Sequence, residues 1–276
     1  DDAYTAGGKS GKRPDRAVIV YSRILRKLYP DSPIILGGLE ASLRRFAHYD
    51  YWDDSVRQSI LFDSQADILT YGMGENQTIE IAKRLAQGKS VKQLRDIKGI
   101  CYYVPTSEYK PGPVVDLPSY ERVCESKKEY AIAARKELEE ADAVRGRTVI
   151  QRHGKYILVQ NPPMPPLTTE ELDWVYSLPY EKYYHPSYEA LGGVPGIKEV
   201  EFSITHNRGC FGACNFCSIA FHQGRAITVR SKESVLDEAR RLVDNPRFKG
   251  YIHDVGGPTA NFRLPSCTFQ KEHGMC

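Results

Sequence analysis

Three cysteines stand close together in the last quarter of the sequence. Cys210, Cys214 and Cys217 lie in the segment NRGCFGACNFC, which follows a β-prone stretch at 200–205. Thiolates are the usual ligands of iron–sulfur clusters, and three of them on one short loop can bind three irons of a four-iron cluster. The fourth iron then has no thiolate from the loop and can bind a substrate or cofactor, as open metal sites do generally. The spacing therefore predicts a redox-active cluster with one open position.

The residues around these cysteines suit a cluster that lies close to the backbone. Gly209 and Gly212 allow the chain to bend and its N–H groups to approach the sulfide ions. Arg208 could offset part of the cluster's charge. Phe211 and Phe216 could shield the cluster from water, which helps to set its reduction potential.

Two other interpretations of the cysteines compete with an iron–sulfur cluster. The three thiols could bind zinc together with a fourth from Cys267 or Cys276, or they could be unconnected buried thiols. The loop has three and then two residues between its cysteines, whereas a zinc ribbon usually has two and two. This difference favours iron–sulfur over zinc.

The composition is that of an ordinary globular protein. Of the 276 residues 41% are hydrophobic, and the net charge is +3, which by itself predicts neither a nucleic-acid nor a membrane partner. The polar N-terminus is no signal peptide, and it lacks an initiator Met, so we expect a processed chain or a fragment. Five of the seven cysteines fall in the last quarter, which favours a reduced, cytoplasmic protein over a secreted disulfide scaffold.

The elements before residue 120 must form a domain of their own. Short apolar runs at 34–36, 67–71 and 100–104 predict strands, and a helix-period pattern separates the second from the third. Alternating strands and helices predict an α/β domain with a parallel sheet. Gly37-Gly38 follows the first strand, where a tight turn is favoured over a ligand contact.

A second α/β unit must position the cysteine loop. Residues 121–143 are helix-prone, and NPPMPP at 161–166 predicts an extended linker. After the cysteine loop, Ser231 is a plausible N-cap for an amphipathic helix, and a strand follows at 250–255. The order strand, loop, helix, strand predicts a crossover between two parallel strands, which is right-handed by default.

The cysteine motif resembles the signature of the radical S-adenosylmethionine (SAM) superfamily: CxxxCxxC with an aromatic residue before the last cysteine. The resemblance implies that Cys210, Cys214 and Cys217 bind a 4Fe–4S cluster and that SAM chelates the fourth iron. It also implies reductive cleavage of SAM to methionine and a deoxyadenosyl radical, which abstracts hydrogen from a substrate. By the same resemblance the chain is an enzyme, with an external electron donor and a small-molecule or macromolecular substrate as partners.

The same resemblance assigns cofactor contacts at other positions. Phe216 corresponds to the aromatic residue that packs near the adenine of SAM. Gly256 and Gly257 correspond to the glycine motif after the second barrel strand, which approaches the amino group of SAM. The superfamily often has Glu after these glycines, whereas this chain has Pro258, so the contact at that position departs from the pattern.

Longer stretches resemble the YgiQ-like family of uncharacterised radical SAM proteins: GGLEASLRRFAHYDYWDDSVRQS, GMGE, ITHNRGCFGACNFCSIAFHQGR, RSKESVLDEA and DVGGPTANF. The family resemblance implies a cobalamin-binding-like α/β domain at 1–120, a helical and Pro/Tyr-rich linker at 121–198, and the first two strands of a partial (β/α) barrel at 199–276. We expect both end domains to be incomplete. Cobalamin is a further implied cofactor, but the region of its ligating His would precede residue 1.

Some residues have roles that the sequence leaves open. Cys267 and Cys276 resemble the start of an auxiliary metal site or are free thiols, whereas Cys101 lies in an apolar strand and is expected in the core. Gln223 and Arg225 either face the active site or, as we favour, support the loop.

Two functions of other classes compete with the enzyme. One is a non-catalytic zinc or iron–sulfur module that docks RNA or protein through the Tyr-rich segment 176–188 and the basic residues near Arg225 and Arg230. The other is an electron-transfer protein, which would not cleave SAM.

Overall fold

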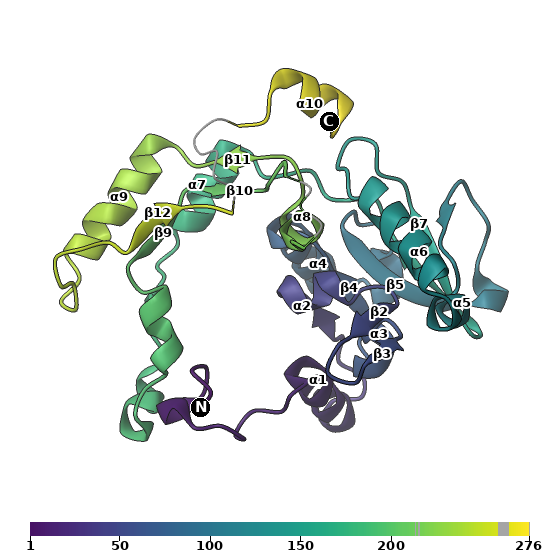
Figure 1. Cartoon of the computed structure of the whole chain (residues 1–276), viewed down its shortest axis with the longest axis horizontal. Helices are drawn as coiled ribbons and strands as arrows, with labels where there is room; N and C mark the ends of the chain where they lie inside the picture. The colour runs from purple at the N-terminus through teal and green to yellow at the C-terminus, as the bar shows by residue number, and fades with distance from the viewer. Residues whose placement is uncertain (213, 215, 259–264, 276) are drawn as a thin grey trace. The chain divides into compact units, whose positions relative to one another are not determined.

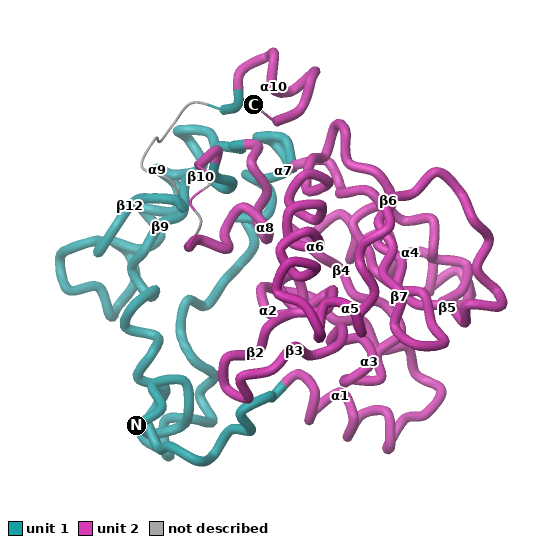
Figure 2. The backbone as a smooth tube through the Cα atoms, turned by 45° about the vertical axis from the view of Figure 1, so that its right-hand side comes forward, with its two compact units in different colours: residues 1–17, 167–210, 227–266 teal, residues 18–166, 211–226, 267–276 magenta. Residues whose placement is uncertain are grey.

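The computed structural model describes residues 1–212, 214, 216–258 and 265–275. The chain forms two compact units (Figure 2). Unit 1 contains residues 1–17, 167–210 and 227–266, and unit 2 contains residues 18–166, 211–226 and 267–276. The borders at 17 and 166 differ from the predicted domain borders at 120 and 198. The reason is that strands and helices of 121–160 pack into unit 2.

Unit 2, in which Figure 1 labels β4, β5 and β7, is built on a six-stranded sheet in the order β1-β4-β5-β8-β7-β6. The pairs β1–β4 and β6–β7 are parallel, and the other three pairs are antiparallel. The predicted parallel sheet of a cobalamin-binding-like domain is therefore corrected to a mixed sheet. The strands are β1 (Ile35–Leu36), β4 (Ile68–Thr70), β5 (Ile100–Pro105), β6 (Val115–Asp116), β7 (Val149–His153) and β8 (Tyr156–Gln160).

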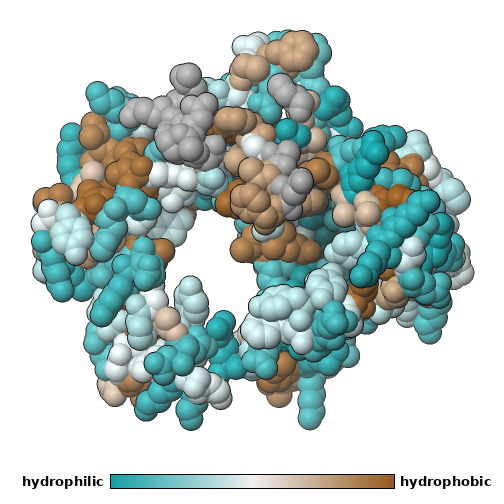
Figure 3. Space-filling model, in the orientation of Figure 1, coloured by the Kyte–Doolittle hydropathy of each residue, from teal (hydrophilic) through white to brown (hydrophobic). Residues whose placement is uncertain are grey.

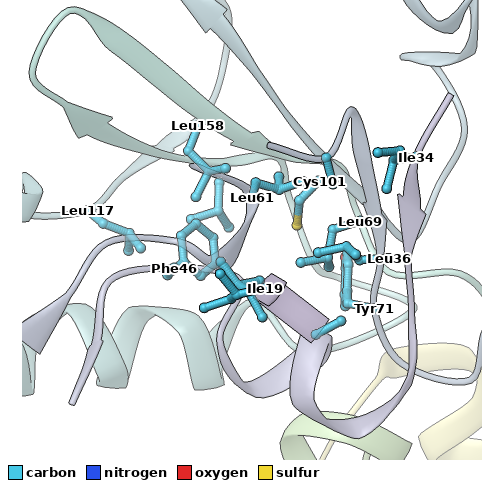
Figure 4. Close-up of a cluster of buried hydrophobic side chains, with 14 residues drawn as sticks. Ile19, Ile34, Leu36, Phe46, Leu61, Leu69, Tyr71, Cys101, Leu117 and Leu158 are labelled. Atoms are coloured by element: carbon cyan, nitrogen blue, oxygen red, sulfur yellow. The ribbon is translucent and has the colours of Figure 1, made fainter. Parts of the chain in front are cut away.

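Both faces of this sheet are covered. Along β5, Ile100 packs with Ile68 and Ile81 on one face, whereas the next residue, Cys101, packs with Leu158 on the other (Figure 4). This alternation follows from the two-residue period of a strand. Cys101 is fully buried as predicted, and burial raises the pKa of its thiol to about 12, so it stays protonated in the core.

The helices and the hairpin of unit 2 lie around the sheet. The hairpin pairs β2 (His48–Asp50) with β3 (Ser55–Arg57). The helices are α1 (Ala17–Leu28), α2 (Gly38–Leu43), α3 (Ile60–Ser64), α4 (Glu75–Ala86), α5 (Tyr120–Glu125), α6 (Lys127–Glu139), α8 (Ile219–Gln223) and α10 (Thr268–His273), with 3-10 turns η2 (Val91–Leu94) and η3 (Thr106–Glu108).

Unit 1 contains the predicted crossover. Strands β9 (Ser203–Thr205) and β12 (Asp254–Gly256) pair in parallel, and α9 (Lys232–Val243) lies between them in sequence. Ser231 is the N-cap of α9, since its side chain accepts a hydrogen bond from the Ser234 N–H, as predicted. The other elements of unit 1 are η1 (Ala6–Gly8), α7 (Thr169–Ser177), η4 (Pro186–Leu191), η5 (Pro195–Glu199), β10 (Asn207–Arg208) and β11 (Thr228–Val229).

The surface is mainly hydrophilic on the face shown in Figure 3, and apolar groups interrupt it in separate patches. In the described part of the chain, no helix combines the length and the apolar character needed to cross a membrane.

His153 is a buried imidazole that the fold keeps neutral. It is 5% exposed, its Nε2 lies 3.1 Å from Gln151 Oε1, and its ring stacks on Tyr120. Burial lowers the pKa of His153 to about 4, and Glu121 offsets only part of that effect.

We expect this histidine to make the fold acid-sensitive. Between pH 6.5 and about 4 the unfolded chain takes up a proton at His153 and the native chain does not. The free energy of unfolding therefore falls in that window, by about 3 kcal/mol for His153. Urea unfolding at pH 7.5 and pH 4.5 measures the fall, which should be smaller in His153→Gln. The difference between the two proteins at pH 7.5 measures the packing that the substitution removes. If the free energy of unfolding fell equally in both proteins between pH 7.5 and pH 4.5, His153 would not be the cause of the acid sensitivity.

Candidate metal centre

A pair of short strands closes the cysteine loop at its base. In β10 and β11, Asn207 pairs with Val229 and Arg208 with Thr228, in antiparallel register. The loop leaves this pair at Gly209, whose φ of 85° lies in the left-handed region that favours glycine. The sequence predicted a bend here, and the structure has it.

A buried arginine holds this base in place. Arg230 follows β11, and its guanidinium forms an ion pair with Glu238 of α9 and donates to the Thr205 carbonyl at 2.9 Å. The centroid of the Tyr176 ring lies 4.3 Å from Cζ of Arg230. Arg208 lies 5.3 Å from the same ring, so the residue expected to offset cluster charge contacts an aromatic face.

The middle of the loop belongs to unit 2. The Cys217 N–H donates to the Cys214 carbonyl at 3.0 Å, which links the backbones of these two cysteines next to a turn at Phe216. The Arg225 side chain donates to the Phe211 carbonyl, and the Arg225 carbonyl accepts from Gln270 of α10, at 3.2 Å in each case. These contacts favour the interpretation of Arg225 as a residue that supports the loop.

Helix α8 follows this turn and packs against α2 (Figure 2). The hydroxyl of Ser42 in α2 accepts a hydrogen bond from the Gly72 N–H at 3.0 Å. It lies 2.9 Å from Nδ1 of His222 in α8 and can donate to that nitrogen. One buried hydroxyl therefore joins α2, the turn after β4 and α8. We call these three residues, Ser42, Gly72 and His222, the serine latch.

Arg45, which follows α2, also holds this helix in place. Its buried guanidinium donates to the carbonyl of Ser42 and to Gln160 Oε1 in β8, and it lies over the Tyr71 ring. Oε2 of Glu137 in α6 lies 4.0 Å from Nη2 of Arg45. Burial raises the pKa of Glu137 to about 7, although Arg45 opposes that shift.

The first glycine turn is a packing feature. Gly38 has a φ of 84°, and a Cβ on Gly37 would lie 2.9 Å from Thr70 Oγ1. Thr70 in turn donates from Oγ1 to the Leu36 carbonyl at 3.1 Å. These contacts support the tight-turn interpretation of Gly37-Gly38.

The three cysteines are free thiols. Cys210 and Cys217 are half-buried and Cys214 is exposed; the loop residues 213 and 215 lie outside the described part. Over the residues that the structure describes, no three His, Cys, Asp or Glu side chains gather as a metal-binding group. Cys210 belongs to unit 1 and the other two to unit 2. The donor set fits an iron–sulfur cluster by its chemistry.

The residues predicted to contact SAM have different surroundings. Phe216 is 93% exposed, so its ring is available to a ligand. Gly256 ends β12, and its carbonyl accepts from the His206 N–H at 2.8 Å. A Cβ on Gly257 would collide with the Asn207 amide, so a side chain there requires that amide to move. The motif thus ends the second parallel strand, as predicted.

The other cysteines are placed as follows. Cys267 is the N-cap of α10, and its exposed Sγ accepts from the Gln270 N–H at 3.4 Å. Cys276 lies outside the described residues, so the predicted auxiliary site is not described as a whole. Cys124 is exposed, and its thiol donates to the Val56 carbonyl at 3.9 Å.

Sequence reasoning missed Ser42 and Asn207. Ser42 lies within the quoted stretch GGLEASLRRF, but nothing local indicates a partner 180 residues away. Asn207 stands three residues before Cys210, and that proximity was its only signal.

The fold and the loop define an α/β protein with a cysteine-rich loop after the first strand of a parallel pair. Residues 1–203 match the family model described as Radical SAM N-terminal. The chain is 54% identical over 280 residues to a UPF0313 protein of Clostridium botulinum (strain 657 / Type Ba4), with all of this chain and 43% of the relative covered. It is 52% identical to a UPF0313 protein of Clostridium perfringens (strain 13 / Type A), with 100% of this chain and 42% of the relative covered. No solved structure matches the chain.

The chain belongs to the Radical SAM N-terminal family, among the UPF0313 proteins, which confirms the predicted YgiQ-like relationship. It spans about 43% of the length of the first of these relatives. The family match ends at residue 203, before the cysteine loop, so the role of the loop is a proposal.

We expect Ser42→Ala to release α8. The change removes a buried hydroxyl that bridges two groups, which costs about 1–2 kcal/mol. Amide hydrogen exchange in 219–224 should therefore accelerate about 5- to 30-fold. Ser64→Ala is the matched control, because Ser64 is equally buried but, among the described residues, its hydroxyl bonds only within and just after α3. Equal exchange of 219–224 in both variants would show that the serine latch does not hold α8.

Proposed function

We propose that this chain is part of a radical SAM enzyme whose 4Fe–4S cluster is bound by Cys210, Cys214 and Cys217. The observation that carries the proposal is the position of the three thiols. They lie on a loop that starts just after β9, and the glycine motif ends β12, the strand parallel to β9. In α/β folds, ligands bind at the carboxyl ends of neighbouring parallel strands, and the start of the loop and the glycine motif both follow such ends in the sequence, which supports the proposal.

The residues of this chain would have distinct roles in that site. The cysteine thiolates bind iron, and the backbone turn at Gly256 and Gly257 admits the amino group of SAM. The exposed ring of Phe216 packs on the adenine. When bound, the cluster supplies the electron that cleaves SAM reductively; the electron donor is external and the substrate is unknown.

Further parts of the proposal concern the whole protein. Thiols that bind iron must stay reduced, so we place the protein in the cytoplasm. Cobalamin binding stays a prediction from the family resemblance.

Anaerobic reconstitution of the intact protein tests the cluster assignment. We expect about four irons per chain and a broad visible absorption from thiolate-to-iron charge transfer. The triple variant C210S/C214S/C217S should lose both, because no thiolate of the loop remains. Cys124→Ser is the matched control, since it removes an exposed free thiol away from the loop and should retain iron.

Three results would contradict the proposal. The first is that the triple variant C210S/C214S/C217S retains its iron. The wild-type protein could bind zinc in place of iron, with loss of zinc in Cys267→Ser, which would favour the non-catalytic zinc module. A reduced cluster that leaves SAM intact would favour an electron-transfer protein.

A further inference from the structure

Asn207 lies where the parallel strands of unit 1 meet the cysteine loop. It begins β10, and the preceding residue, His206, bonds through its N–H to the Gly256 carbonyl at 2.8 Å. The Asn207 side chain lies against Gly257, in the space that a Cβ would need. The amide is therefore part of the glycine turn that ends β12.

The amide of Asn207 is buried and lacks a partner. The residue is 0% exposed, and neither Nδ2 nor Oδ1 has a hydrogen bond within the described ranges. A primary amide offers two donors and an acceptor, and leaving them unpaired in the interior is costly. Since most buried polar groups in folded proteins are paired, an amide with both ends unpaired indicates a missing ligand.

We propose that Asn207 binds the α-amino-acid end of SAM. The inference rests on the proposed function and adds a residue to it. The ligand must present an acceptor and a donor side by side. The carboxylate of SAM accepts from Nδ2, and its amino group, which keeps N–H donors when its lone pair is on the iron, donates to Oδ1.

The position of Asn207 favours the amino-acid end over the adenine. An adenine also presents a donor and an acceptor that suit an Asn amide. However, the amino-acid end is the part of SAM that reaches the open iron. Asn207 stands three residues before Cys210, at the base of the loop that would bind that iron.

Two ligands distinguish a contact with the amino-acid end of SAM from a contact with its adenine. S-adenosylhomocysteine has the amino-acid end, whereas methylthioadenosine has the same nucleoside without it. Calorimetric titration of the intact, reconstituted protein should show that Asn207→Leu weakens binding of S-adenosylhomocysteine at least tenfold. Binding of methylthioadenosine should change by less than about twofold. Asn207→Asp keeps the shape of the side chain but repels the carboxylate, so it should weaken the same ligand selectively.

Thermal unfolding of the cluster-free protein tests whether the amide is structural. Because the side-chain amide of Asn207 has no hydrogen-bond partner among the described residues, Asn207→Leu should unfold at the same temperature or higher. Asn161 is the matched control: its buried amide donates to the carbonyls of Arg95 and Ile97 at 2.8 and 2.6 Å. Asn161→Leu should therefore lower the midpoint.

The following results would overturn the inference about Asn207, the proposed function, or both. Unchanged binding of S-adenosylhomocysteine in Asn207→Leu, or an equal loss for both ligands, overturns the inference and leaves the proposed function standing. A midpoint that falls as far as in Asn161→Leu also overturns it, because the amide is then structural. A wild-type protein that binds neither iron nor either nucleoside overturns the proposed function, and the inference with it.

Discussion

The closure of the cysteine loop depends on a buried ion pair between Arg230 and Glu238. Arg230 is buried beside β11, and its guanidinium bonds to the Thr205 carbonyl at the end of β9 and to Ser234 in α9. Lys182 supplies a second positive charge to Glu238. Loss of one partner from such a pair leaves an uncompensated buried charge, at a cost of about 3–5 kcal/mol. The pair thus makes the base of the loop a fixed part of unit 1.

The two ends and the middle of the loop are held by different means. Strand pairing holds the ends in unit 1, whereas the serine latch and Arg225 hold the middle within unit 2. The thiols themselves are not drawn into a group in the described residues. The protein therefore supplies three soft ligands on one supported loop. Metal binding often completes the folding of such a site.

Local sequence was sufficient for the features that local physics determines. The N-cap at Ser231, the buried Cys101, the bend at Gly209 and the glycines at the end of β12 all follow from neighbouring residues. The direction of β5 does not, because a strand buried on both faces has an apolar run in either orientation and the connection from β4 to β5 is long. For β7 and β8 the two-residue connection allows only the antiparallel pairing that the structure has.

Contacts between distant segments were beyond local reasoning. Ser42 and His222 meet across 180 residues, and no periodicity encodes that meeting. The thiol roles of the loop were inferred from residue type and spacing, which indicate chemistry without giving geometry. Asn207 could not be recognised from its type, because the unpaired state of its amide becomes visible only after β9, β10 and β12 are assembled.

The contact between Asn207 and Gly257 has an evolutionary consequence. The amide of one residue fills the volume that any side chain at the other would require. A methyl group at 257 requires the Asn207 amide to move or a smaller residue to stand at 207, whereas residue 207 can change while Gly257 stays. Among descendants of this sequence, a side chain at 257 should therefore be accompanied by a change at 207, although fifty residues separate the two sites along the chain.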